Sequence, residues 1–127
     1  MNALPPGRNA PGDPRLAARL RRETNAEVLF RPADRGRYAT DASIYQQEPI
    51  GVVVPRSIAD VEAAMAICRE EGVPILPRGG GTSQCGQTVN RALVLDCTKY
   101  LRRVLEVDAK AGVARVEPGT TTPIGSC

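Results

Sequence analysis

The chain has 127 residues, which suits one domain with a hydrophobic core and is too short for two independent domains. Aromatic residues make up 3% of it, the net charge is only +3, and no nucleic-acid reader motif is present, so a nucleic-acid-binding protein is disfavoured. The four cysteines form no C-x-x-C pair and histidine is absent, which excludes a zinc-type ligand set. We therefore expect no metal site.

The hydropathy of the chain argues against membrane spanning and secretion. No apolar run approaches the roughly 18 residues that cross a bilayer, and residues 1–12 lack the apolar core of a signal peptide. The arginine-rich start is also found in organelle transit peptides, but its prolines and Asp13 argue against that interpretation. Because the cysteines show no pairing pattern and no signal peptide precedes them, we interpret them as free thiols in a reducing compartment. We therefore expect a cytoplasmic protein.

A short basic helix is predicted at the amino end. Asp13 is a good N-cap and Pro14 a good first helical residue, which predicts a helix over Pro14–Glu23. Its arginines indicate a solvated face, with contact to a membrane surface or to another part of a larger protein as the alternatives. Residues 25–49 carry prolines and little periodicity and are predicted to form an extended connecting arm. Residues 1–37, which contain the helix and the first part of this arm, are predicted to form a first unit.

A strand–helix–strand unit follows. Gly51–Val54 is a β-branched run that predicts a buried strand, and the helix Ile58–Glu71 is delimited by Ser57 as N-cap and Gly72 as C-terminal stop. Val73–Leu76 is predicted as the second strand. Such a unit has a right-handed crossover and presents ligands with the loops at the carboxyl ends of its strands.

The remaining elements are predicted as strands. Ala92–Asp96 forms one, and Leu101–Val107 with Gly112–Val116 forms an antiparallel pair. The fold class is therefore α+β, a βαβ unit followed by β-strands in a mixed sheet.

The run from Pro77 to Gln87 carries the main functional signal. Three consecutive glycines, Gly79–Gly81, free the backbone to form a concave nest of N–H groups for an anion. Thr82 and Ser83 add hydroxyl donors, and Arg78 adds a positive charge at the rim. A plain turn is the alternative, but a hairpin needs fewer glycines. A phosphate or pyrophosphate is the expected guest.

Two common phosphate motifs do not match this loop. The spacing from Gly81 to Thr88 is that of a Walker A loop, but Gln87 stands in place of the lysine that contacts the β and γ phosphates. The dinucleotide fingerprint G-x-G-x-x-G opens a helix after the first strand of its unit, whereas these glycines follow the second strand. A nucleoside triphosphatase and a Rossmann domain are therefore disfavoured.

A third pattern matches, and it is carried by the ordered segments Pro49–Ser57, Val73–Ser83 with Gly86–Gln87, Leu93–Leu101 and Val116–Gly119. Together they resemble the FAD-binding domain of the vanillyl-alcohol oxidase and p-cresol methylhydroxylase (PCMH) flavoproteins. The resemblance covers residues 38–119 and implies the first subdomain of a PCMH-type FAD-binding domain. Residues 120–127 depart from the family pattern and are expected to form a disordered tail.

The resemblance implies specific cofactor contacts. Backbone N–H groups would hold the FAD pyrophosphate, and a second turn would approach the flavin; these residues are Arg78, Gly79, Gly80, Gly81, Thr82, Ser83, Gly86, Gln87, Pro118 and Gly119. Thr82 stands where some members carry a histidine bonded to the flavin. Because the chain has no histidine, FAD is expected to bind non-covalently.

Within the family, residues 38–45 and 81–88 are most similar to large dehydrogenases of D-lactate, glycolate and related 2-hydroxy acids, some of which continue into an iron–sulfur region. The resemblance implies hydride transfer from a small 2-hydroxy acid to FAD. Relatives have several hundred residues, so the chain resembles an amino-terminal fragment, and no catalytic residue is assigned. The alternative is an inactive fragment that binds a phosphate ligand or a protein partner.

Overall fold

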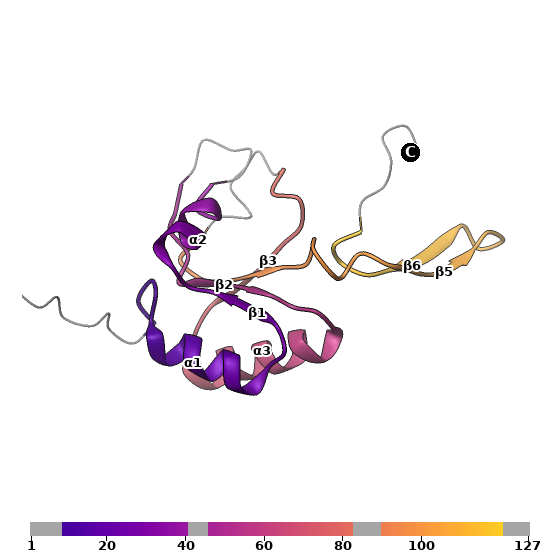
Figure 1. The fold of residues 1–127 in the computed structure, drawn as a ribbon. Helices are drawn as coiled ribbons and strands as arrows, with labels where there is room; N and C mark the ends of the chain where they lie inside the picture. Colours follow the sequence, from indigo (N-terminus) through magenta and orange to yellow (C-terminus); the bar gives the residue numbers. More distant parts are fainter. Residues whose placement is uncertain (1–8, 41–45, 83–89, 121–127) are drawn as a thin grey trace, which may run out of the picture.

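The protein is described here from a computed structural model that covers residues 9–40, 46–82 and 90–120. The elements follow in the order α1 (Pro14–Glu23), β1 (Glu27–Leu29), α2 (Pro32–Arg37), β2 (Gly51–Val54), α3 (Ile58–Glu71), β3 (Ile75–Arg78), β4 (Leu93–Asp96), β5 (Val104–Asp108) and β6 (Val113–Val116). The central sheet has the strand order β1-β2-β4-β3, with β1 antiparallel and the other three strands parallel. The predicted α+β class with a mixed sheet is confirmed (Figure 1).

Two helices cover one face of the sheet and a third lies on the other (Figure 1). Helices α1 and α3 lie against the first face, where the main apolar core gathers Leu20, Val53, Ile67 and Leu93, all fully or almost fully buried. On the face of α2, a smaller cluster is centred on strand residues of β2 and β4. Burial on both faces explains why β2 and β4 are continuous apolar runs.

Local capping accounts for the bounds of the two longer helices, which were predicted correctly. Asp13 accepts a hydrogen bond from the N–H of Arg15 at 3.0 Å at the start of α1. Ser57 accepts one from the N–H of Asp60 at 3.3 Å at the start of α3. Gly72 ends α3 with a φ of 67°, a left-handed conformation that favours glycine.

The prediction of an extended arm over residues 25–49 is wrong in part. Strand β1 pairs with β2 from Glu27 opposite Val54 to Leu29 opposite Val52, and helix α2 follows it. The ring of Phe30 then packs over Gly51, where an added Cβ would lie 2.2 Å from the ring. This segment is therefore part of the folded body.

The predicted strand–helix–strand unit exists, but its two strands are not neighbours. Strand β4 lies between β2 and β3 and pairs in parallel with both. Strand β3 also runs from Ile75 to Arg78, two residues later than predicted, because Pro77 is accommodated in this edge strand. Arg78 is thus the last residue of a strand as well as the first of the loop.

Strands β5 and β6 form a separate two-stranded hairpin that extends from the body (Figure 1). The predicted antiparallel pair is confirmed, but it is not part of the central sheet. Val104 pairs with Val116 and Val107 with Ala114, so these four residues share one face of the hairpin. This apolar face is exposed to solvent.

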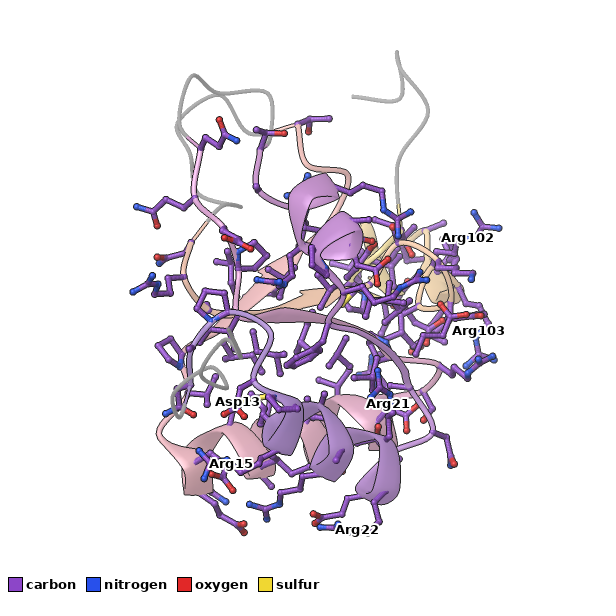
Figure 2. The ribbon with its side chains drawn as sticks, turned by 60° about the vertical axis from the view of Figure 1, so that its left-hand side comes forward. Asp13, Arg15, Arg21, Arg22, Arg102 and Arg103 are labelled. Atoms are coloured by element: carbon purple, nitrogen blue, oxygen red, sulfur yellow. The ribbon has the colours of Figure 1, made fainter. Side chains whose placement is uncertain are left out.

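The arginines of α1 differ in exposure and in the number of their ion pairs. Figure 2 shows Arg15 and Arg22 pointing outward from the helix; both are exposed, and each has one acidic partner at 3.7 Å. Arg19 is less exposed and forms ion pairs with Glu23 on its own helix and with Glu70 and Glu71 at the end of α3. Among the described residues, no helix combines the length and the apolar character required to cross a membrane.

Candidate functional site

The carboxyl ends of β2, β4 and β3 meet at one edge of the sheet. The parallel register places Arg78 of β3 opposite Asp96 of β4, and the N–H of Cys97 donates to the carbonyl oxygen of Arg78 at 3.1 Å. The glycine loop leaves the sheet at this edge and rises on the side of α2 (Figure 1). Loops at this position are the usual ligand-binding segments of parallel sheets.

The described part of the loop, residues 79–82, presents N–H groups for which the described residues supply no acceptor. Gly79, Gly80 and Thr82 are exposed. Within the described ranges, no residue accepts a hydrogen bond from the N–H groups of Gly79, Gly80, Gly81 or Thr82. Of the three glycines, only Gly81 has a left-handed φ, 69°. The loop therefore carries donors suited to an anion, with a single left-handed turn.

The side chain of Arg78 bends back towards the segment before β2. Its Nη2 donates to the carbonyl oxygen of Thr40 at 2.8 Å and its Nη1 to that of Tyr38 at 3.3 Å. The guanidinium also lies over the Tyr38 ring, 5.2 Å from the centroid. The expected charge at the rim is therefore held by backbone carbonyls of another segment.

Tyr38 and Asp96 form a polar pair at the same edge, and neither was predicted as a site residue. The Tyr38 hydroxyl donates to Oδ2 of Asp96, while Oδ1 of Asp96 accepts from the N–H and the hydroxyl of Thr98 at 2.9 and 2.6 Å. Burial, reinforced by the bond to Asp96, raises the pKa of Tyr38 to about 12. An acid that ends a buried strand is the sequence signal that could have pointed to this pair.

A pocket of about 480 Å³ opens beside this pair. Its lining includes Tyr38, Val54 and Asp96, together with the charged side chains of Glu27, Arg37 and Lys99. Hydrogen bonds from Lys99 and then from Tyr100 lower the pKa of Glu27 below its usual range. The pocket thus places polar side chains at the carboxyl ends of β2 and β4.

The predicted residues Pro118 and Gly119 lie in a tight turn after the hairpin. The N–H of Gly119 donates to the carbonyl oxygen of Leu101 at 2.7 Å, and an added Cβ would lie 2.0 Å from the carbonyl oxygen of Cys97. Among the described residues, no hydrogen bond or ion pair joins this turn to residues 78–82. Packing against the segment after β4 is sufficient reason for glycine at position 119.

Three other predicted cofactor-binding residues, Ser83, Gly86 and Gln87, lie outside the described residues. Within the part of the chain that the structure describes, no group of three or more histidine, cysteine or acidic side chains is placed to hold a metal ion.

Comparison with known proteins agrees with this geometry. Residues 49–123 match the model of a family described as FAD binding domain. The chain is 41% identical over 90 residues to the D-2-hydroxyglutarate dehydrogenase of Escherichia coli (strain K12), an alignment that covers 68% of this chain and 9% of that protein. It is 40% identical over 88 residues to the glycolate oxidase subunit GlcD of Bacillus subtilis (strain 168), covering 67% of this chain and 18% of that protein.

The fold is also found in a solved structure. The structure of p-cresol methylhydroxylase with substrate bound superposes with a TM-score of 0.68 at 20% identity, covering 84% of this chain and 22% of that one. Together with the family match and the two relatives, this shared fold confirms the predicted resemblance to the FAD-binding domain of the PCMH flavoproteins. The chain spans only a small part of each of these proteins. The family match over residues 49–123 shows that the chain belongs to the family described as FAD binding domain.

Proposed function

We propose that this chain holds the pyrophosphate of FAD, without a covalent bond, on the backbone N–H groups of residues 78–83. The observation that carries the proposal is the set of N–H groups on Gly79, Gly80, Gly81 and Thr82, for which the described residues provide no acceptor. They project from the carboxyl ends of the parallel strands. Gly79 and Gly80 have no side chains, so nothing on these two residues blocks an approaching phosphate. A histidyl bond to the flavin is not available to this chain, because it contains no histidine.

The fit to a dianionic group rests on the charges around the loop. Peptide N–H dipoles can bind a pyrophosphate without a dedicated lysine, and Thr82 adds an exposed hydroxyl. The carboxylate of Asp96 is occupied by Tyr38 and Thr98 and is largely buried at the strand end. Gly86, Gln87 and the turn at Pro118 and Gly119 are proposed to complete the contacts.

The proposed activity is the oxidation of a small 2-hydroxy acid by a flavin-dependent oxidoreductase. FAD would accept a hydride from the hydroxyl-bearing carbon of the substrate. The role of this chain in that reaction is to bind and orient the cofactor. The names of the two relatives, which refer to 2-hydroxyglutarate and glycolate, support the substrate class.

We further propose that turnover requires protein beyond these 127 residues, because the chain spans 9% and 18% of those relatives. The buried, unpaired thiols of Cys68 and Cys97 support a reducing compartment such as the cytoplasm. Contact of the exposed arginines with a membrane surface stays a prediction.

The test is a titration of the purified chain with FAD, followed by flavin fluorescence. We expect micromolar binding that ADP, which shares the pyrophosphate, weakens by competition and that riboflavin, which lacks phosphate, does not. Gly80→Glu should weaken binding by about tenfold or more, because it places a carboxylate beside the phosphate. Absence of FAD binding by folded wild-type protein would reject the proposal for this chain.

Two matched variants separate the site from the fold. Gly80→Ala should bind nearly as wild type, since an added Cβ meets only Thr82 Cγ2 at an ordinary 3.7 Å and the φ is not left-handed. Ala109→Glu adds the same charge at the exposed tip of the hairpin and should leave the affinity unchanged. Equal losses in Gly80→Glu and Ala109→Glu would show that charge alone, and not the loop, governs binding.

A further inference from the structure

The guanidinium of Arg78 is directed to the main chain of a distant segment. It bonds the carbonyl oxygens of Tyr38 and Thr40 and lies over the ring of Tyr38. A planar guanidinium can do all three at once, whereas an ammonium group on a flexible stem cannot. These contacts tie the start of the glycine loop to the segment that precedes β2.

The glycine loop is in direct contact with this guanidinium. A Cβ built on Gly81 would lie 2.5 Å from Nη2 of Arg78 and 3.1 Å from its Cζ. Gly81 is also the loop glycine with a left-handed φ. The backbone of Gly81 therefore packs directly on the Arg78 side chain, and the left-handed bend of the loop lies at this contact.

Tyr38 links this contact to the sheet. Tyr38, over which the guanidinium lies, donates its hydroxyl hydrogen bond to Asp96 at the end of β4. Asp96 is the register partner of Arg78 in the β3–β4 ladder. The contacts of Arg78, Tyr38 and Asp96 thus run from the loop to the central strand without a gap.

We propose that Arg78 is a positioning residue: its side chain shapes the loop by supporting Gly81 and by bonding residues 38 and 40, and it does not serve as the charge that binds the phosphate. For its ligand, this inference rests on the proposed function of the loop. Its consequence is that the N–H groups of residues 79–82 are pre-arranged in the free protein, which lowers the ordering cost of binding.

The first test compares Arg78→Lys with Arg78→Ala in the FAD titration. We expect Lys and Ala to weaken binding to a similar extent, about tenfold, because lysine keeps the charge but loses the fork that bonds two carbonyls. The slope of affinity against salt concentration should stay that of the wild type, since no phosphate contact is lost. The control Arg91→Ala removes one charge beside the amino end of β4 and should change neither quantity.

A phosphate-binding charge would give a different pattern. In that case Arg78→Lys would retain an affinity within about twofold of the wild type, and Arg78→Ala would reduce the salt slope. That outcome overturns the positioning role and leaves the proposed function standing.

A second test needs no cofactor and remains decisive if FAD does not bind. Free energies of unfolding are measured for Arg78→Ala, Gly81→Ala and the double variant. Gly81→Ala should destabilise the wild type more than it destabilises Arg78→Ala, because the clash with the guanidinium is gone in the latter. Additive effects would overturn the inference. If Arg78→Ala does not fold, Arg78→Lys replaces it in this cycle.

Discussion

The hydroxyl of Tyr38 donates a hydrogen bond to Oδ2 of Asp96, and this bond connects the end of α2 with the end of the central strand β4. The two residues are 58 positions apart in the chain. Because the guanidinium of Arg78 lies over the ring of Tyr38, we expect a change in this pair to lower the stability of the protein and to weaken the proposed binding of FAD.

The first prediction concerns alkaline pH. The pKa of Tyr38 is raised to about 12 in the folded protein, above its value of about 10 in the unfolded chain. The protonated phenol is therefore favoured by folding, and its stabilisation is complete below pH 10 and lost as the pH rises towards 12. Tyr38→Phe should abolish this part of the alkaline fall in unfolding free energy, measured by urea denaturation at several pH values.

The matched control for that experiment is Tyr100→Phe. It removes a phenol hydroxyl that donates a hydrogen bond to Glu27 at 2.9 Å. Glu27 lines the pocket that Tyr38 and Asp96 also line. This variant should keep the wild-type fall between pH 10 and 12. If Tyr38→Phe also keeps it, the Tyr38–Asp96 bond does not contribute to the pH dependence.

The second prediction concerns Gly119. Gly119→Ala places a Cβ 2.0 Å from the carbonyl oxygen of Cys97 and 2.7 Å from that of Leu101, and both neighbours are backbone. We expect a loss of about 3 kcal/mol or more in unfolding free energy. Gly112→Ala is the control: its φ of 67° is left-handed, a backbone strain that Gly119 does not have, but nothing lies within 4 Å of its added Cβ. It should cost only about 1 kcal/mol; similar losses would contradict the packing role.

The third prediction concerns acid pH. Hydrogen bonds from the Arg103 side chain and then its backbone N–H lower the pKa of the Glu117 carboxyl. Its stabilisation is therefore present above its ordinary pKa and lost as the pH falls through the lowered value. Glu117→Gln should be less stable than the wild type at neutral pH, with a smaller decrease in Tm on acidification. A parallel decrease in both proteins would show that this pair is not responsible.

The fourth prediction concerns the apolar face of the hairpin, defined by Val104, Val107, Ala114 and Val116. Val107 is 68% exposed, and exposed apolar strands promote association between copies. Val107→Lys should raise the monomer fraction in size-exclusion chromatography at high protein concentration. Val113→Lys adds the same charge to the opposite face and should raise it less. Equal behaviour of the two variants would argue against association through the apolar face.

The elements that the sequence predicts best are those with local signals. Helix α3 was predicted with its bounds because Ser57 and Gly72 mark its ends through their own backbone. Helix α2 has weaker signals: Pro32 stands in its first turn, but its N-cap, Arg31, makes no capping bond through its side chain. Strand β1 is three residues long and depends on its pairing with β2. Both elements are too short to show a hydrophobic period and could not be predicted from periodicity.

The candidate site divides in the same way. The glycines of the loop are visible in the sequence because they are consecutive. The side-chain contacts of Arg78 were not predicted, because its partners are carbonyl oxygens of residues 38 and 40, and every residue has a carbonyl group. The packing of Gly119 against Cys97 likewise depends on a chain path that no local pattern specifies.

The position of β4 between β2 and β3 has a consequence for how the chain folds during synthesis. Strand β3 is completed before β4 exists, yet in the sheet β4 is the strand with which it pairs. Until residues 93–96 have left the ribosome, β3 has an unpaired edge and the core lacks Leu93 and Leu95. Assembly of the body therefore waits for this late strand, and the interval exposes apolar segments to chaperones or to aggregation.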